Sequence, residues 1–132
     1  MFVLDTTTVS DYLRGNKGIR NRLRQTSSSL IYVTSITKYE IEYGLIKKPK
    51  LRQVYRRQLG LLYDAIGYLD FDDDAAISAA RIKHQLFSNG TPIGVEDFLI
   101  GAIAMSREFT VVTSNMKHFE RIKGLKIQDW KN

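Results

Sequence analysis

Short apolar runs alternate along this chain with longer segments in which apolar side chains recur at helical spacing. The short runs are rich in β-branched and aromatic side chains, and they predict strands at residues 2–4, 30–34, 67–71, 110–113 and 125–127. The longer segments predict helices at residues 9–13, 19–25, 35 to about 47, 51–66, 75–88 and 95–104, with one or two further turns within 116–121. This alternation implies right-handed crossovers, and therefore an α/β fold whose mainly parallel sheet of four to five strands carries helices on both faces.

Helical spacing also predicts which side of each helix is buried. The predicted buried sets are Ile36, Tyr39 and Tyr43 in the third helix, Val54, Leu61, Leu62 and Ala65 in the fourth, and Val95, Leu99, Ala102 and Ile103 in the sixth. Thr37 and Glu40, three residues apart, fit a capping box at the start of the third helix, which would explain Glu40 without any chemistry. Trp130, near the end of the chain, is expected to anchor packing.

Polar side chains gather where the predicted strands end and the following helices begin. Asp5 follows the first strand directly, and Asn115 follows the fourth, while Glu40 and Asp97 lie near the starts of two helices. In open parallel sheets the carboxyl ends of the strands form the ligand-binding edge, so these four side chains are expected at one rim. Each carboxylate also has a purely structural explanation, because acids cap helices and stabilise their amino-terminal ends.

A group of carboxylates from separate elements is a typical site for hard divalent cations. Mg²⁺ and Mn²⁺ bind carboxylate oxygens and keep several waters, so Asp5, Glu40 and Asp97 would suffice as ligands. The three adjacent acids Asp72 to Asp74 are better explained as helix-capping residues. Neither His84 nor His118 has a sequence partner that would specify metal binding or general-base catalysis.

The composition of the chain excludes several classes of protein and favours others. The chain has 132 residues, which predicts a single domain spanning 1–132, and its formal net charge of +6 favours polyanionic partners such as nucleic acid. The absence of cysteine excludes disulfides, thiolate zinc sites and a cysteine nucleophile. No apolar run is long enough to span a bilayer and no secretion signal is evident, so a soluble cytoplasmic protein is expected. A phosphate-binding glycine-rich loop is also absent, which argues against nucleotide hydrolysis and dinucleotide oxidoreduction.

In combination, motifs along nearly the whole chain resemble those of PIN-domain ribonucleases, and most closely the VapC-type toxins of prokaryotic toxin–antitoxin modules. The matching motifs are Leu4-Asp5-Thr6, Thr34-Ser35-Ile36-Thr37 leading to Glu40 and Gly44, Pro92-Ile93-Gly94 leading to Asp97 and Ala102, Thr113-Ser114-Asn115 leading to His118-Phe119, and Gly124-Leu125 leading to Trp130. The resemblance implies a PIN-like (Rossmann-like) three-layer α/β/α fold and Mg²⁺- or Mn²⁺-dependent endoribonuclease activity, with transfer RNA as a substrate by analogy. It also implies a homodimer inhibited by a VapB-like antitoxin.

Carried over by position, Asp5, Glu40 and Asp97 would be the catalytic, metal-binding acids of such a ribonuclease, and Thr6 and Asn115 would orient waters or carboxylates. Asn115 stands where many relatives carry a fourth acid, and Glu120 is a candidate to supply the missing carboxylate.

Two departures from the family pattern leave a second hypothesis open. Many relatives carry asparagine where this chain has Thr7, and Asn115 removes a further charge, so an inert PIN-like module that binds RNA or a protein without cutting is the alternative. A phosphatase or receiver domain that uses Asp5 as a nucleophile is a third hypothesis. It lacks support, because no second acid lies two positions after Asp5.

Overall fold

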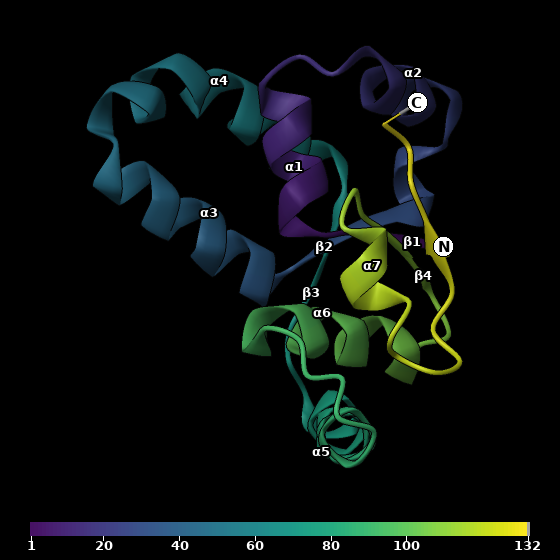
Figure 1. The fold of residues 1–132 in the computed structure, drawn as a ribbon. Helices are drawn as coiled ribbons and strands as arrows, with labels where there is room; N and C mark the ends of the chain where they lie inside the picture. Colours follow the sequence, from purple (N-terminus) through teal and green to yellow (C-terminus); the bar gives the residue numbers. More distant parts are fainter. Residues whose placement is uncertain (132) are drawn as a thin grey trace.

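A computed structural model, which describes residues 1–131, has a five-stranded sheet at its centre with helices on both sides (Figure 1). The strands follow the order β3-β2-β1-β4-β5, and every neighbouring pair is parallel. Their bounds are β1 Phe2–Leu4, β2 Ile31–Thr34, β3 Gly67–Leu69, β4 Thr110–Val112 and β5 Ile127–Gln128. The predicted α/β fold with three layers is confirmed, although β5 begins two residues later and ends one residue later than predicted.

Within residues 1–131, seven α-helices connect and cover the strands. Their bounds are α1 Thr6–Leu13, α2 Lys17–Gln25, α3 Ser35–Lys47, α4 Pro49–Ala65, α5 Asp73–Ser88, α6 Val95–Ser106 and α7 Met116–Phe119, and a 3-10 turn occupies Ser28–Leu30. In Figure 1, α1 to α4 lie on one side of the sheet and α5 and α6 on the other. None of the helices in the described part of the chain combines the length and the apolar character that crossing a bilayer requires.

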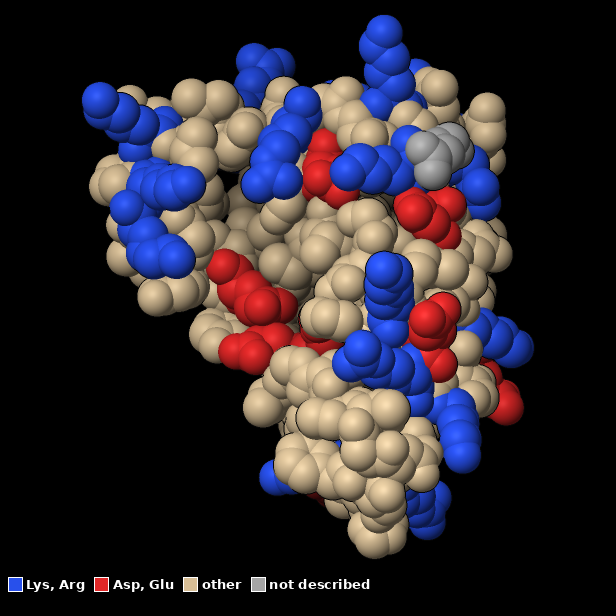
Figure 2. Space-filling model, viewed as in Figure 1, with Lys and Arg blue, Asp and Glu red and all other residues tan. Residues whose placement is uncertain are grey.

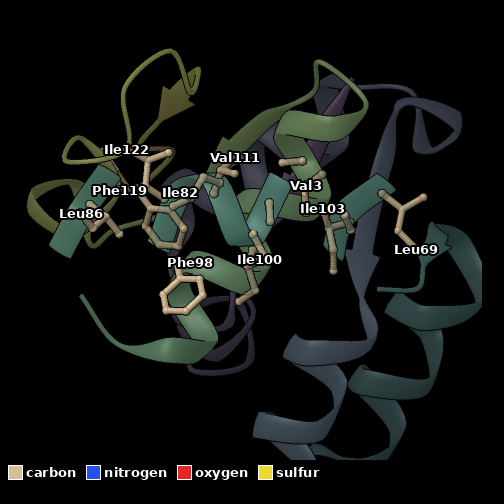
Figure 3. Packing of buried hydrophobic residues seen from close by; sticks show 14 residues of the cluster. Val3, Leu69, Ile82, Leu86, Phe98, Ile100, Ile103, Val111, Phe119 and Ile122 are labelled. Atoms are coloured by element: carbon tan, nitrogen blue, oxygen red, sulfur yellow. The ribbon is translucent and has the colours of Figure 1, made fainter. Parts of the chain in front are cut away.

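Alternate strand residues build the two cores, because successive side chains of a strand point to opposite faces. Val3 and Val111 face the core shared with α5 and α6, whereas Leu4 and Val112 face the core shared with α1 to α4. Figure 3 shows the first of these cores, where Phe98 and Ile100 of α6 meet the sheet. The central strand β1 contributes Val3 to one core and Leu4 to the other, so packing on both faces of the sheet holds its end in place.

The predicted capping box at the start of α3 is wrong. Thr34 is the N-cap, and its hydroxyl accepts a hydrogen bond from the backbone N–H of Thr37 at 3.1 Å. Thr37 therefore lies inside the helix. Glu40 lies further along the helix and is not part of the cap, which removes the structural explanation for this carboxylate.

The predicted buried faces of three helices are wrong in part. In α3, Tyr39 and Tyr43 are exposed, and the face that packs carries Thr37, Ile41 and Leu45. The tyrosines tolerate water because each carries a polar hydroxyl on its apolar ring.

In α4 and α6, some side chains predicted to be buried are exposed. Helical spacing shows which residues share a face, but it does not show how much of that face a neighbouring element covers. Of the four side chains predicted to be buried in α4, Leu62 is buried, whereas Val54, Leu61 and Ala65 are exposed. Leu59, which was not predicted, is buried as well. Val95 is exposed because it is the first residue of α6, while most of the rest of that helix is buried.

Other local predictions are confirmed. Asp72 is the N-cap of α5 and accepts from the backbone N–H of Ala75 at 2.9 Å, so the acidic run is explained by capping. Gly101 of α6 is in close contact with a neighbour, since a Cβ added there would lie 2.7 Å from Cδ1 of Ile122. Trp130 is buried and packs edge-on against Phe2, with ring centroids 5.1 Å apart.

Trp130→Ala is expected to lower the free energy of unfolding by about 3 to 5 kcal/mol, because it removes a large buried ring that closes the core under β1. Val54→Ala, at a side chain that is 65% exposed, is the control and should change it by less than about 0.5 kcal/mol. Urea denaturation measures both values. A Trp130→Ala variant as stable as the control would contradict the assigned packing.

Candidate active site

The candidate site lies at the carboxyl-terminal edge of the sheet. Asp5 leaves the end of β1, Asn115 follows β4, Glu40 comes from α3 and Asp97 comes from the first turn of α6. Acidic side chains gather in a hollow on this face, with lysine and arginine side chains around it (Figure 2). The predicted convergence is supported by electrostatics, because the charges of Asp97, Glu96 and Asp5 all act on Glu40.

Asp5 is buried and its carboxylate is fixed by three neighbouring residues. Oδ1 accepts from the backbone N–H of Thr8 at 2.9 Å and from the hydroxyl of Thr7 at 2.8 Å, and Oδ2 accepts from the hydroxyl of Thr113 at 2.6 Å. Burial raises the pKa of Asp5 above its ordinary value, although the hydrogen bonds from Thr113, Thr8 and Thr7 oppose that rise. Asp5 therefore caps α1 and also presents a preoriented carboxylate at the rim.

Glu40 is half-buried, and its position is set by a residue of α1. The Thr6 hydroxyl donates to Glu40 Oε1 at 2.5 Å and lies 3.2 Å from the Thr37 hydroxyl. Burial raises the pKa of Glu40, and so do the negative charges of Asp97, Glu96 and Asp5, whereas the Thr6 hydrogen bond lowers it. Crowded carboxylates of this kind repel one another unless a cation lies among them.

Asp97 is in contact with His118, which follows β4 and lies beside Asn115. Nδ1 of His118 lies 3.1 Å from Asp97 Oδ2, and the same nitrogen lies 2.8 Å from the side-chain amide nitrogen of Asn115. The backbone N–H of Asn115 donates to the Thr113 hydroxyl at 2.8 Å, which connects this group to Asp5. Nδ1 of His118 can make only one of these two hydrogen bonds at a time, because it must carry a hydrogen to donate to Asp97 and must lack one to accept from the Asn115 amide.

Two residues of the site, Glu96 and His118, were not assigned a role from the sequence. Glu96 lies near Glu40 and accepts from the Tyr39 hydroxyl at 2.9 Å, a contact that raises the pKa of Tyr39. His118 contacts Asp97 across the fold. The available signals were weak, namely the adjacency of Glu96 to Asp97 and the three-residue spacing of Asn115 and His118. Glu120 is exposed just after α7, and its assignment stays a prediction.

The carboxylates have the oxygen ligands that a hard cation prefers, although among the residues that the structure describes they do not form a complete set around one position. Within residues 1–131, no three acidic, histidine or cysteine side chains are grouped closely enough to form a complete ligand set. Mg²⁺ does not need one, because it keeps several waters and binds through one or two carboxylates. The oxygen-only chemistry of Asp5, Glu40 and Asp97 and their mutual repulsion at Glu40 fit such an ion.

Comparison with known proteins shows which family this chain belongs to. The PIN domain family matches residues 2–125. The chain is 36% identical to the tRNA(fMet)-specific endonuclease VapC of Salmonella typhimurium, over 98% of this chain and 97% of that protein. It is 28% identical to the ribonuclease VapC2 of Rickettsia felis, over 78% of this chain and 76% of that protein.

Solved structures agree with the sequence relatives. The DNA-bound VapBC structure from Salmonella typhimurium matches with a TM-score of 0.89 and 35% identity, covering 98% of this chain and 97% of that chain. VapBC2 from Rickettsia felis, bound to a promoter DNA fragment, matches with a TM-score of 0.90 and 26% identity, covering 98% of each chain. The chain therefore belongs to the PIN domain family and, within it, to the VapC ribonucleases.

Proposed function

We propose that this protein is a metal-dependent endoribonuclease, acting as a single PIN domain and as the toxin of a VapBC-type toxin–antitoxin module. The observation that carries the proposal is the convergence of Asp5, Glu40 and Asp97 at the strand ends, in a chain that belongs to the VapC ribonucleases. The substrate proposed is transfer RNA in the cytoplasm, supported by the name of the Salmonella relative and by the net charge of +6.

The chain's own residues hold the three acids in place for hydrolysis of a phosphodiester. Thr7, Thr8 and Thr113 fix Asp5, and Thr6 holds Glu40 toward it. His118 donates to Asp97 from the other side when its Nδ1 carries the hydrogen, and the side chain of Asn115 lies beside the same nitrogen. Asp5, Glu40 and Asp97 would hold Mg²⁺ or Mn²⁺, which would lower the pKa of a bound water and neutralise charge on the phosphodiester. Because the acids are preoriented, little reorganisation is needed when substrate arrives.

Two protein partners follow from the same assignment. A VapB-like antitoxin is proposed because the solved relatives are VapBC complexes. A homodimer is proposed by family analogy, and the exposed apolar side chains of Tyr43 and Ile46 on α3 offer a surface for it. If the purified chain is monomeric at micromolar concentration in analytical ultracentrifugation, the homodimer proposal fails.

Asp97→Asn is expected to reduce cleavage of transfer RNA at least about a hundredfold, the size typical of losing one group that stabilises transition-state charge. The matched control is Asp74→Asn, an exposed acid in the first turn of α5, which should cut as the wild type does. Fragment mapping in Mg²⁺ and in EDTA measures both. RNA binding that persists in EDTA, with no cutting in Mg²⁺ or Mn²⁺, would instead support the inert binding module.

Glu40→Gln is expected to raise the melting temperature at pH 7 in EDTA, because it removes a charge that is disfavoured by burial and repelled by three neighbouring acids. The folded pKa lies above the ordinary value of 4.5, so this destabilisation is absent below pH 4.5 and grows as pH rises through the folded pKa. The gain should therefore vanish on acidification. Mg²⁺ should stabilise the wild type more than the variant.

Glu42→Gln is the matched control for that experiment, since Glu42 lies on the same helix but pairs with Arg52 at 2.7 Å. Losing this surface ion pair should leave the melting temperature unchanged or slightly lower. A Glu40→Gln variant that melts like the Glu42→Gln variant in EDTA would show that the charge of Glu40 does not destabilise the fold.

If Glu120 supplies a fourth carboxylate, Glu120→Gln should weaken Mn²⁺ binding several-fold in isothermal titration. Unchanged affinity and unchanged dependence of cleavage on Mn²⁺ would rule Glu120 out. The comparison variant is Glu108→Gln, because Glu108 lies at the opposite end of α6 from Asp97.

A further inference from the structure

A cavity of about 240 Å³ opens beside the candidate active site, between α1, α3 and the start of α4. Thr6 and Glu40 line this cavity as well as the acidic site. Figure 2 shows the hollow next to the acidic side chains on the same face. Any group that occupies the cavity therefore lies next to the phosphodiester that the acids would hydrolyse.

The walls of the cavity combine an apolar interior with a basic rim. Leu13, Ile41, Leu45, Leu51 and Tyr55 form its apolar part, and Arg14, Lys47 and Lys48 are the cations that line it. All three cations are exposed, so their charges can reach a bound polyanion. Its volume is below the range of about 300 to 1,000 Å³ of drug-sized ligand pockets, which suits a single nucleobase.

Gly44 keeps this cavity open. It lies in the interior of α3, where glycine is less favourable than alanine, and it lines the cavity. A Cβ added at Gly44 would meet no atom within 4 Å, so packing within the described structure does not require glycine here. The missing side chain instead leaves space for a ligand.

We propose that this cavity is a substrate subsite, which receives a nucleobase next to the scissile phosphodiester while Arg14, Lys47 and Lys48 contact the flanking phosphates. The inference rests on the proposed ribonuclease function and deepens it. RNA is favoured over a protein segment because the apolar pocket, the cationic rim and the hydrolytic acids are continuous, and together they match a base, its phosphates and the reacting bond.

Gly44→Leu tests the subsite by filling it from the helix side. The probe is tRNA(fMet) transcript, measured for cleavage in Mg²⁺ and for binding in EDTA. We expect about a tenfold or greater loss of kcat/KM and of affinity, in line with the loss of one stacked base. Mn²⁺ affinity should stay at the wild-type value, since the acids are untouched, and the melting temperature should not fall.

Gly60→Leu is the matched control. Gly60 lies in the interior of α4, an added Cβ there also meets no atom within 4 Å, and it is not among the residues of this cavity. Its cleavage and binding should stay within about twofold of the wild type. Should Gly44→Leu not fold, Lys48→Glu against Lys50→Glu gives the same comparison, because only Lys48 lines the cavity and both lysines are exposed.

The outcomes separate the subsite from the function it rests on. If the wild type neither binds nor cuts RNA, the proposed function fails and the subsite fails with it. If the wild type cuts and Gly44→Leu cuts equally well, the subsite alone is overturned. Gly44→Leu that cuts normally but escapes inhibition by a VapB-like antitoxin would also overturn it, and would assign the cavity to the protein partner.

Discussion

The buried carboxylate of Asp5 is the constraint on which the rest of the site depends. It stands at the end of β1, the central strand, and it accepts hydrogen bonds from residues that start α1 and end β4. Through Thr113 and Asn115, the same network continues to His118 and Asp97. The sheet order therefore determines which acids meet, because β1 lies between β2, which leads into α3, and β4.

Like-charged carboxylates at this rim oppose folding and favour a cation. The pKa values of both Asp5 and Glu40 are raised, mainly by burial and at Glu40 also by three neighbouring acids. A fold selected for stability alone would not place charges in this way. Sites that bind substrate or metal often carry such a cost, since the ligand restores the lost stability when it binds.

The sequence predicted the element types and the rim, because strand ends and helix starts carry local signals. Asp5 after β1 and Asp97 at the start of α6 follow from those signals. Which face of α3 is buried could not be predicted in the same way. Tyr39 and Tyr43 recur at helical spacing like core residues, and yet both are exposed to water. Contacts between distant segments, such as His118 with Asp97, depend on the crossovers of the finished fold and leave no local pattern.

Diffraction from crystals grown with Mn²⁺, recorded at the manganese absorption edge, tests the central claim most directly. The account predicts an anomalous peak within coordination distance of carboxylate oxygens of Asp5 and Asp97, with Glu40 bound directly or through water. No peak at this rim at millimolar Mn²⁺, or a peak bound only by the acids at the start of α5, would contradict it.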